Sequence, residues 1–190
     1  MRPDASPDKV QRIVTSAAHL HFNQDWRFNS QPLNAQWTPR PTIGGRAWPS
    51  VTMVTGDQDP DVLTLRAIAL LLWLNTTVGS AVRWLWSSRQ QTGRGIMTRE
   101  VIKTLPVLDV RTLTKDQLIA CGGIFHRLKT EALHPLHELP QDTTRHTLDR
   151  ALLSEVLGWP PLWFAEHGPM DILRQKLAAE PSIHGHRNHR

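Results

Sequence analysis

The chain has 190 residues, of which 21% are charged and 39% hydrophobic, a composition typical of a globular protein and not of a disordered one. Its longest uncharged window, 67–82, contains Asn75 and two threonines and is shorter than the roughly 20 apolar residues of a membrane span, so we expect no transmembrane helix. The single cysteine, Cys121, excludes an internal disulfide, and no secretory leader is visible, so we expect a cytoplasmic protein.

The positive charge is concentrated in one stretch. The net charge is +5, from 22 basic and 17 acidic residues, yet the stretch 66–103 holds six cations against only one acid, Glu100. These cations are Arg66, Arg83, Arg89, Arg94, Arg99 and Lys103. From Pro106 onward, acids and bases balance at ten each. The local excess predicts one basic face suited to a polyanion, although a solubilising surface would explain the same charges.

The front half is predicted to be irregular and rich in β structure around one buried helix. Residues 1–18 are polar and weakly patterned, so we expect a weakly ordered N-terminal segment. Between 19 and 56, short alternating runs are interrupted by prolines and by Gly44-Gly45, which is typical of edge strands and turns. Asp-Pro-Asp at 59–61 predicts a helix start, and the helix that follows is apolar on nearly every side, so we expect it to be central and buried.

Further along the chain the pattern becomes helical. We expect a bend or break at 75–79, a continuation that ends at 87–91, a loop at 91–98 and a short helix at 99–105.

Thr114 with Gln117 predicts a capping box at the start of the next helix, and Asp142 predicts the start of another, which ends at Gly158. A last helix is expected at 170–179.

The predicted class is therefore α+β, with a short irregular β-rich front half around a buried helix and a helical back half. We divide the chain into a weakly ordered segment 1–18, an α+β core 19–110, a helical region 111–186 and a polar tail 187–190.

The sequence lacks three common patterns for catalysis, cofactors and metals. An acid two residues before a lysine, as in many metal-dependent nucleases, does not occur. Pro135 separates His134 from His137 and prevents a helix from aligning them as zinc ligands. The turn 93–95 follows a predicted helix, whereas a dinucleotide-binding glycine turn follows a strand. We therefore expect a protein that is not an enzyme and has no cofactor and no metal site.

Several segments resemble one protein family. WRFNSQPL (26–33), PTIGGRAWPSV (41–51), the run 69–110, LDRALLSEVLG (148–158) and AAEPSIHG (178–185) are similar to the C-terminal region of large bacterial DNA methyltransferase-like proteins of restriction-modification and phage-defence systems. The resemblance covers residues 20–186, and its most specific pieces lie at 44–48, at 72–75 with Gly79, and at 93–95 leading to 105–107.

The resemblance implies a target-recognition domain, which reads the DNA sequence. In that family a separate upstream domain binds S-adenosylmethionine and methylates an adenine amino nitrogen through an Asn-Pro-Pro-Tyr loop. That loop cannot occur here, because the chain contains no tyrosine and no Asn-Pro pair. The implied function is a recognition module without catalysis of its own. Its implied partners are double-stranded DNA and a separately encoded S-adenosylmethionine-dependent methyltransferase subunit.

The first group of candidate DNA contacts lies on the turn at Gly44-Gly45. Glycine permits a tight turn and a close backbone approach, so Arg46 could donate two hydrogen bonds to a guanine or a phosphate while Trp48 braces the turn. The alternative is that Arg46 meets solvent and Trp48 belongs to the core.

The second group follows a predicted helix end. Arginine and glutamine suit guanine and adenine edges, whereas lysine suits phosphates. The alternative is an exposed basic helix end, favoured by the helix dipole. The residues of this group are Arg89, Gln90, Gln91, Gly93, Arg94, Gly95, Arg99 and Lys103.

Two other functions stay open. The chain could be a protein-interaction fragment that docks on a methyltransferase, for which the apolar cluster at 159–164 is suited. It could also be the remnant of a split gene, without a function.

Overall fold

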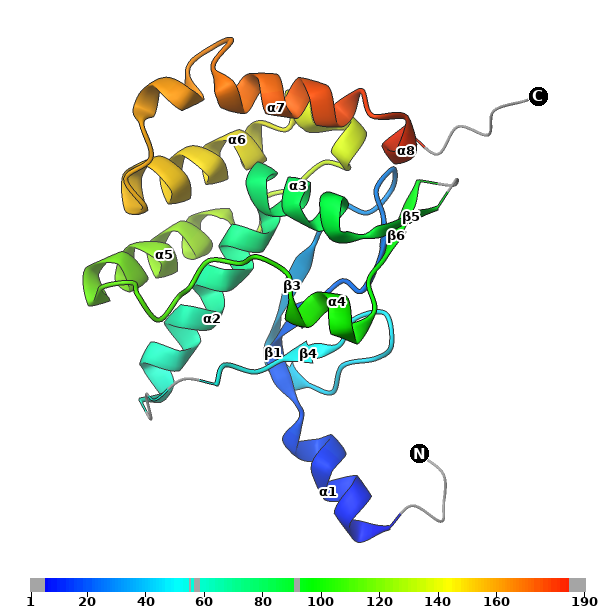
Figure 1. Cartoon of the computed structure of the whole chain (residues 1–190). Coiled ribbons are helices and arrows are strands. Elements are labelled where there is room, and N and C mark those ends of the chain that lie inside the picture. The colour runs from blue at the N-terminus through cyan, green and yellow to red at the C-terminus, as the bar shows by residue number, and fades with distance from the viewer. Residues whose placement is uncertain (1–5, 55, 57–58, 91–92, 185–190) are drawn as a thin grey trace, which may run out of the picture.

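The computed structural model describes residues 6–54, 56, 59–90 and 93–184 (Figure 1). These residues form two small antiparallel sheets packed with helices, which confirms the α+β class. The segment 1–18, predicted to be weakly ordered, contains helix α1 (Pro7–Thr15), which has no buried residue and projects from the body in Figure 1.

The two sheets are joined by the short connection between β1 and β2. The first sheet has the order β3-β1-β4, with β1 at Ala18–Phe22, β3 at Ala35–Thr42 and β4 at Ser50–Val51. The second has the order β2-β6-β5, with β2 at Asp25–Arg27, β5 at Ser88–Gln90 and β6 at Arg94–Ile96. The prediction of a helix end at 87–91 is therefore wrong, because the helix ends at Trp86 and residues 88–90 form a strand.

The central helix is bent as predicted. Helix α2 (Pro60–Asn75) starts at Asp59, whose side chain accepts a hydrogen bond from the Asp61 N–H. It is followed at once by α3 (Thr77–Trp86), and the two axes differ by 73°. Gly79 permits the bend, since a Cβ there would lie 2.2 Å from the Trp73 carbonyl oxygen.

The remaining helices follow the predicted order. The capping box at Thr114 and Gln117 is present, and the Asp142 side chain caps α6 through the Arg145 N–H. The helices are α4 (Arg99–Lys103), α5 (Lys115–Leu128), α6 (Thr143–Asp149), α7 (Pro169–Ala178) and α8 (Pro181–His184), with a π-helical segment at Arg150–Val156 and 3-10 segments at Leu136–Gln141 and Pro161–Phe164.

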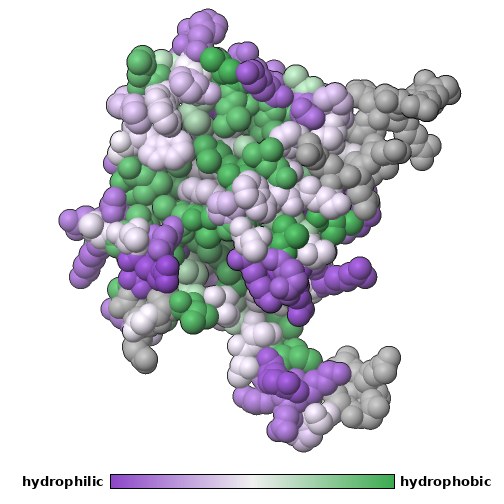
Figure 2. All heavy atoms as spheres, viewed as in Figure 1, coloured by the Kyte–Doolittle hydropathy of each residue, from purple (hydrophilic) through white to green (hydrophobic). Residues whose placement is uncertain are grey.

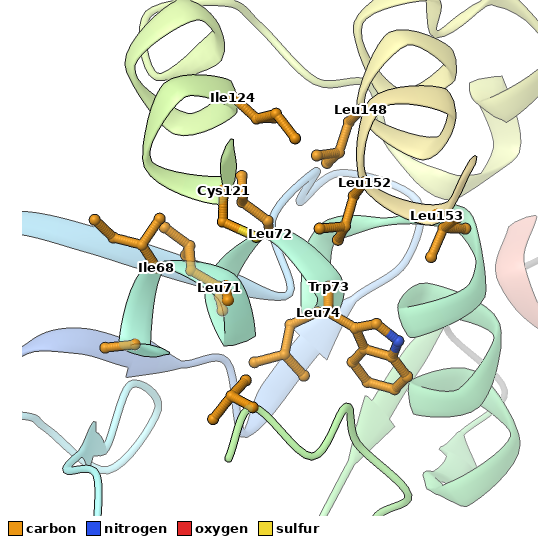
Figure 3. Packing of buried hydrophobic residues seen from close by; sticks show 14 of the residues in the cluster. Ile68, Leu71, Leu72, Trp73, Leu74, Cys121, Ile124, Leu148, Leu152 and Leu153 are labelled. Carbon is orange, nitrogen blue, oxygen red and sulfur yellow. The ribbon is translucent and has the colours of Figure 1, made fainter. Parts of the chain in front are cut away.

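The main hydrophobic core draws on both halves of the chain. Figure 3 shows Leu71 and Leu72 of α2 facing Cys121 of α5 and Leu152 of the π-helical segment. A second cluster, around Trp26, lies under the β2-β6-β5 sheet and the C-terminal helices. Burial of apolar surface from both halves therefore stabilises them together.

Two buried ion pairs also join distant segments. The guanidinium of Arg145 donates to Asp142, to the Ser80 hydroxyl and to three backbone carbonyls, so that all five of its N–H groups have partners. Asp149 accepts from Arg174 at 2.8 Å, and also from the backbone N–H and the hydroxyl of Thr77.

Cys121 is expected to be unreactive in the folded protein. It is fully buried, and desolvation raises the pKa of its thiol to about 11. Relative to an ordinary thiol, the thiolate fraction at pH 8 falls roughly 100-fold. Labelling with a chromogenic disulfide at pH 8 should therefore be slow in buffer and fast in concentrated urea. Equal rates in the two solvents would contradict the buried position.

Within the described residues, no single helix has the length and apolar composition of a membrane span. Helices α2 and α3 reach that length only together, as the bent pair.

Candidate nucleic-acid interface

The turn 43–49 is held against the β1–β2 connection by backbone hydrogen bonds. Gln24 N–H donates to the Ala47 carbonyl at 2.8 Å, and Phe22 N–H donates to the Pro49 carbonyl at 3.1 Å. The predicted close backbone approach occurs at Gly44, where a Cβ would lie 2.2 Å from the Ser50 nitrogen. The turn is therefore anchored at its middle and at its end.

The side chains of this turn face different surroundings. Arg46 is exposed and Trp48 is half-buried. Trp48 is therefore neither a fully buried core residue nor a fully exposed side chain. The turn does not close a hairpin, because β3 and β4 both pair with β1 and lie on opposite sides of it.

Arg94 lies on β6 in an ion pair. Its Nε and Nη2 donate to the two carboxylate oxygens of Asp25 on β2. The pair is partly open to solvent, with the Arg94 side chain 36% exposed and that of Asp25 30% exposed. The expectation of a loop at 91–98 is wrong for this residue, because Arg94 lies in strand β6 and is paired with a carboxylate.

Three arginines act on the same carboxylate. The hydrogen bonds from Arg94 are the main cause that lowers the pKa of Asp25, and the nearby charges of Arg27 and Arg46 lower it further. Three segments that are distant in the sequence, β2, the turn 43–49 and β6, therefore place cations around one point.

The register of the second sheet aligns part of this group. Arg27 is directly opposite Arg94, and Gln90 is opposite Arg94 on the other side. Directly paired residues project from the same face of a sheet, so the exposed Arg27 lies beside Arg94. Like charges in this position repel each other, and the adjacent Asp25 offsets the repulsion.

Two glycines fit β6 tightly against the body. Gly95 is buried, and a Cβ there would lie 2.2 Å from the ring of Phe28. Gly93 has a φ of +70°, which favours glycine, and a Cβ there would lie 2.8 Å from the Ile183 carbonyl oxygen of α8. Both glycines therefore serve packing. A side chain at either position would force the neighbouring atoms to move.

Arg83 does not belong to a basic surface, contrary to the prediction from the charge distribution. It is fully buried under the second sheet, where its Nη2 donates to the carbonyls of Asn23, Gln24 and Gly95. Desolvation lowers its pKa to about 9, so the guanidinium remains charged at neutral pH. Its hydrogen bonds join β6 to the β1–β2 connection from below.

Helix α4 extends the basic region beyond β6. Arg99 and Lys103 are both exposed, and Lys103 forms an ion pair with Glu100 at 2.9 Å. Met97, between β6 and α4, donates its N–H to the Gln24 carbonyl at 3.1 Å. Figure 2 shows hydrophilic side chains gathered over α4 on the face that it views.

The candidate residues are thus brought together in part. Arg94 is hydrogen-bonded to Asp25, the charge of Arg46 acts on the same carboxylate, and Arg99 and Lys103 lie on the next element, α4. The backbone of Arg89 and Gln90 belongs to β5, and Gln91 lies outside the described residues. Sequence reasoning missed Arg27 and Asp25, which lie within and beside the segment WRFNSQPL (26–33).

In the described part of the chain, no group of three or more His, Cys, Asp or Glu residues could hold a metal ion. Comparison with protein-family models, with curated protein sequences and with solved structures finds no match to this chain.

Proposed function

We propose that the chain is a DNA-binding recognition module of a restriction-modification-type system, which acts in the cytoplasm without catalysis of its own. The observation that carries the proposal is the placement of three cations around Asp25: Arg94 donates to it, Arg27 is paired with Arg94 across β2 and β6, and the turn that carries Arg46 is bonded to the adjacent Gln24. The resemblance to the target-recognition region of DNA methyltransferase-like proteins supports it.

The charge of the region suits a duplex. Five cations, Arg27, Arg46, Arg94, Arg99 and Lys103, stand against the two carboxylates Asp25 and Glu100. Such an excess attracts phosphates and releases their counterions on binding. Anchored backbone under Arg46 and Arg94 gives the cations fixed positions, which recognition of a rigid duplex needs.

The test is the salt dependence of duplex binding. Fluorescence anisotropy of a labelled 25-bp duplex with the purified chain should show a log affinity that falls with log salt. We expect a slope of about −3 if only Arg27, Arg46 and Arg99 reach phosphates, and about −4.5 if all five cations do.

Two variants test whether the salt dependence of duplex binding arises from this basic region. Replacing Arg46 and Arg99 together with glutamine should reduce the slope by about 2. The matched control is Arg127→Gln, which removes one exposed cation of α5 and should leave the slope unchanged. A slope near zero for the unmodified chain would contradict DNA binding, and equal effects of both variants would contradict the assigned region.

A second candidate function is docking on a separately encoded methyltransferase subunit. It is favoured by large apolar side chains exposed around the 3-10 segment 161–164 and α7, with Leu162 76%, Trp163 40% and Ile172 44% exposed. This function predicts little duplex binding by the chain alone and co-purification with the methyltransferase subunit when the two are produced together.

A further inference from the structure

The ion pair of Arg94 uses only one side of the guanidinium. Nε and Nη2 donate to Asp25, which takes two of the five N–H groups of an arginine. Both N–H groups of Nη1 and the second N–H of Nη2 have no protein partner among the described residues. One N–H of Nη1 and the second N–H of Nη2 form the end-on edge of the guanidinium, and the side chain is partly exposed.

The backbone on both sides of this pair is fixed. On β6, Gly95 is in contact with Phe28, and Arg83 holds its carbonyl from below. On β2, the Trp26 indole donates to the Gln31 carbonyl at 2.6 Å, and the Arg27 N–H donates to the Gln31 side chain at 2.9 Å. The guanidinium is therefore oriented before any ligand binds, and little of its side-chain entropy is left to lose on binding.

The neighbouring carboxylate determines which ligand suits the free edge. A phosphate placed at the end of Arg94 would bring a second negative charge close to Asp25, and like charges repel. A guanine edge is neutral and offers two acceptors, O6 and N7, at the spacing of two parallel N–H groups. The ion pair offsets the charge of Arg94, which therefore suits a neutral base better than a phosphate. Arg27 and Arg46 have no ion pair within the described residues, so their charges are left for phosphates.

We propose that Arg94 reads a guanine of the DNA target through its Nη1–Nη2 edge and that Asp25 is the positioning residue that orients it. This inference rests on the proposed DNA-binding function. Arg94 would be the contact that determines specificity within the basic region, and the other cations would contact the phosphates of the DNA backbone.

The experiment uses a duplex pool with 12 randomised central base pairs, selected on the purified full chain and sequenced after each round. We expect an enriched motif with one G·C pair preferred roughly 10- to 100-fold over the alternatives. Arg94→Lys keeps the charge and loses the fork, so this preference should fall below about threefold, while the other positions of the motif stay enriched.

Asp25→Asn tests the positioning role. It should weaken the same preference and leave affinity for unselected DNA equal or higher, because a negative charge is removed. The control Arg99→Gln should weaken binding to all sequences alike. A purely structural role of Asp25 would lower both affinities together, which would overturn the assignment.

A measurement with the unmodified protein keeps the inference testable if the variants fail to fold, because only the DNA is changed. Replacing the preferred guanine with 7-deazaguanine removes N7 and should weaken binding about tenfold. Unchanged binding, or a G·C preference that survives Arg94→Lys, overturns the inference. Salt-dependent binding without any enriched motif also overturns it and leaves DNA binding without sequence recognition, whereas absence of salt-dependent binding removes DNA binding as well.

Discussion

Replacement of Arg145 with alanine is expected to lower the free energy of unfolding by about 3–5 kcal/mol. The side chain is fully buried and supplies five hydrogen bonds that join α6 to the end of α2, to α3 and to the segments around Pro32 and His134. Without it, the buried carboxylate of Asp142 loses its ionic partner, and an uncompensated charge in the interior is costly.

Urea unfolding followed by circular dichroism measures this effect. Arg145→Lys keeps the charge but has three donors in place of five, so it should fall between the alanine variant and the unmodified protein. The control Arg127→Ala removes an exposed arginine of α5 and should change the free energy by less than about 0.5 kcal/mol. A midpoint for Arg145→Ala equal to that of the control would show that the buried network contributes nothing.

The second large effect is expected for Asp149. Its carboxylate accepts three hydrogen bonds, from Arg174 and from the N–H and the hydroxyl of Thr77 at the start of α3. Asp149→Ala leaves the Arg174 guanidinium, whose side chain is only 5% exposed, without its partner, and should cost about 3–5 kcal/mol.

A double-mutant cycle separates the ion pair from the packing. Asp149→Asn with Arg174→Met removes both charges while it keeps similar volumes, and such neutral replacements are often close to neutral in stability. We therefore expect the double variant to unfold at a higher urea concentration than Asp149→Ala. The cycle also needs the two single variants, Asp149→Asn and Arg174→Met. If the loss of unfolding free energy in the double variant equals the sum of their two losses, the charges are not coupled.

Local signals were sufficient for the helices. Asp59 and the pair Thr114 and Gln117 are capping residues whose partners lie within three positions, so the sequence alone predicts where those helices begin. The buried helix α2 was also predictable, because it is apolar all round and only a core can accommodate it.

The second sheet could not be predicted, because its causes are distant in sequence. The segment 88–96 has little alternation and few β-branched residues. Its strands β5 and β6 pair with each other, β6 also pairs with β2, and Arg83 donates to the Gly95 carbonyl. For the same reason the charge distribution misplaced Arg83, whose acceptors lie around residue 24 and at Gly95. A count of charges along the chain does not show which cations the fold uses internally.

In the candidate site, too, the local features were predictable from the sequence and the long-range contacts were not. The glycine at position 44 marked a close backbone approach, and the structure has it there. The pairing of Arg94 with Asp25 joins residues 69 positions apart, and no local pattern indicates it.

The backbone of Gln24 has a consequence for how this surface could change during evolution. Its N–H binds the turn that carries Arg46, and its carbonyl accepts from Met97, next to the strand that carries Arg94, as well as from Arg83. The backbone of this one residue therefore fixes the distance between the two segments that carry the arginines. Insertions in either segment would disturb both, so we expect relatives with other ligand preferences to differ in their side chains while they retain the lengths of these segments.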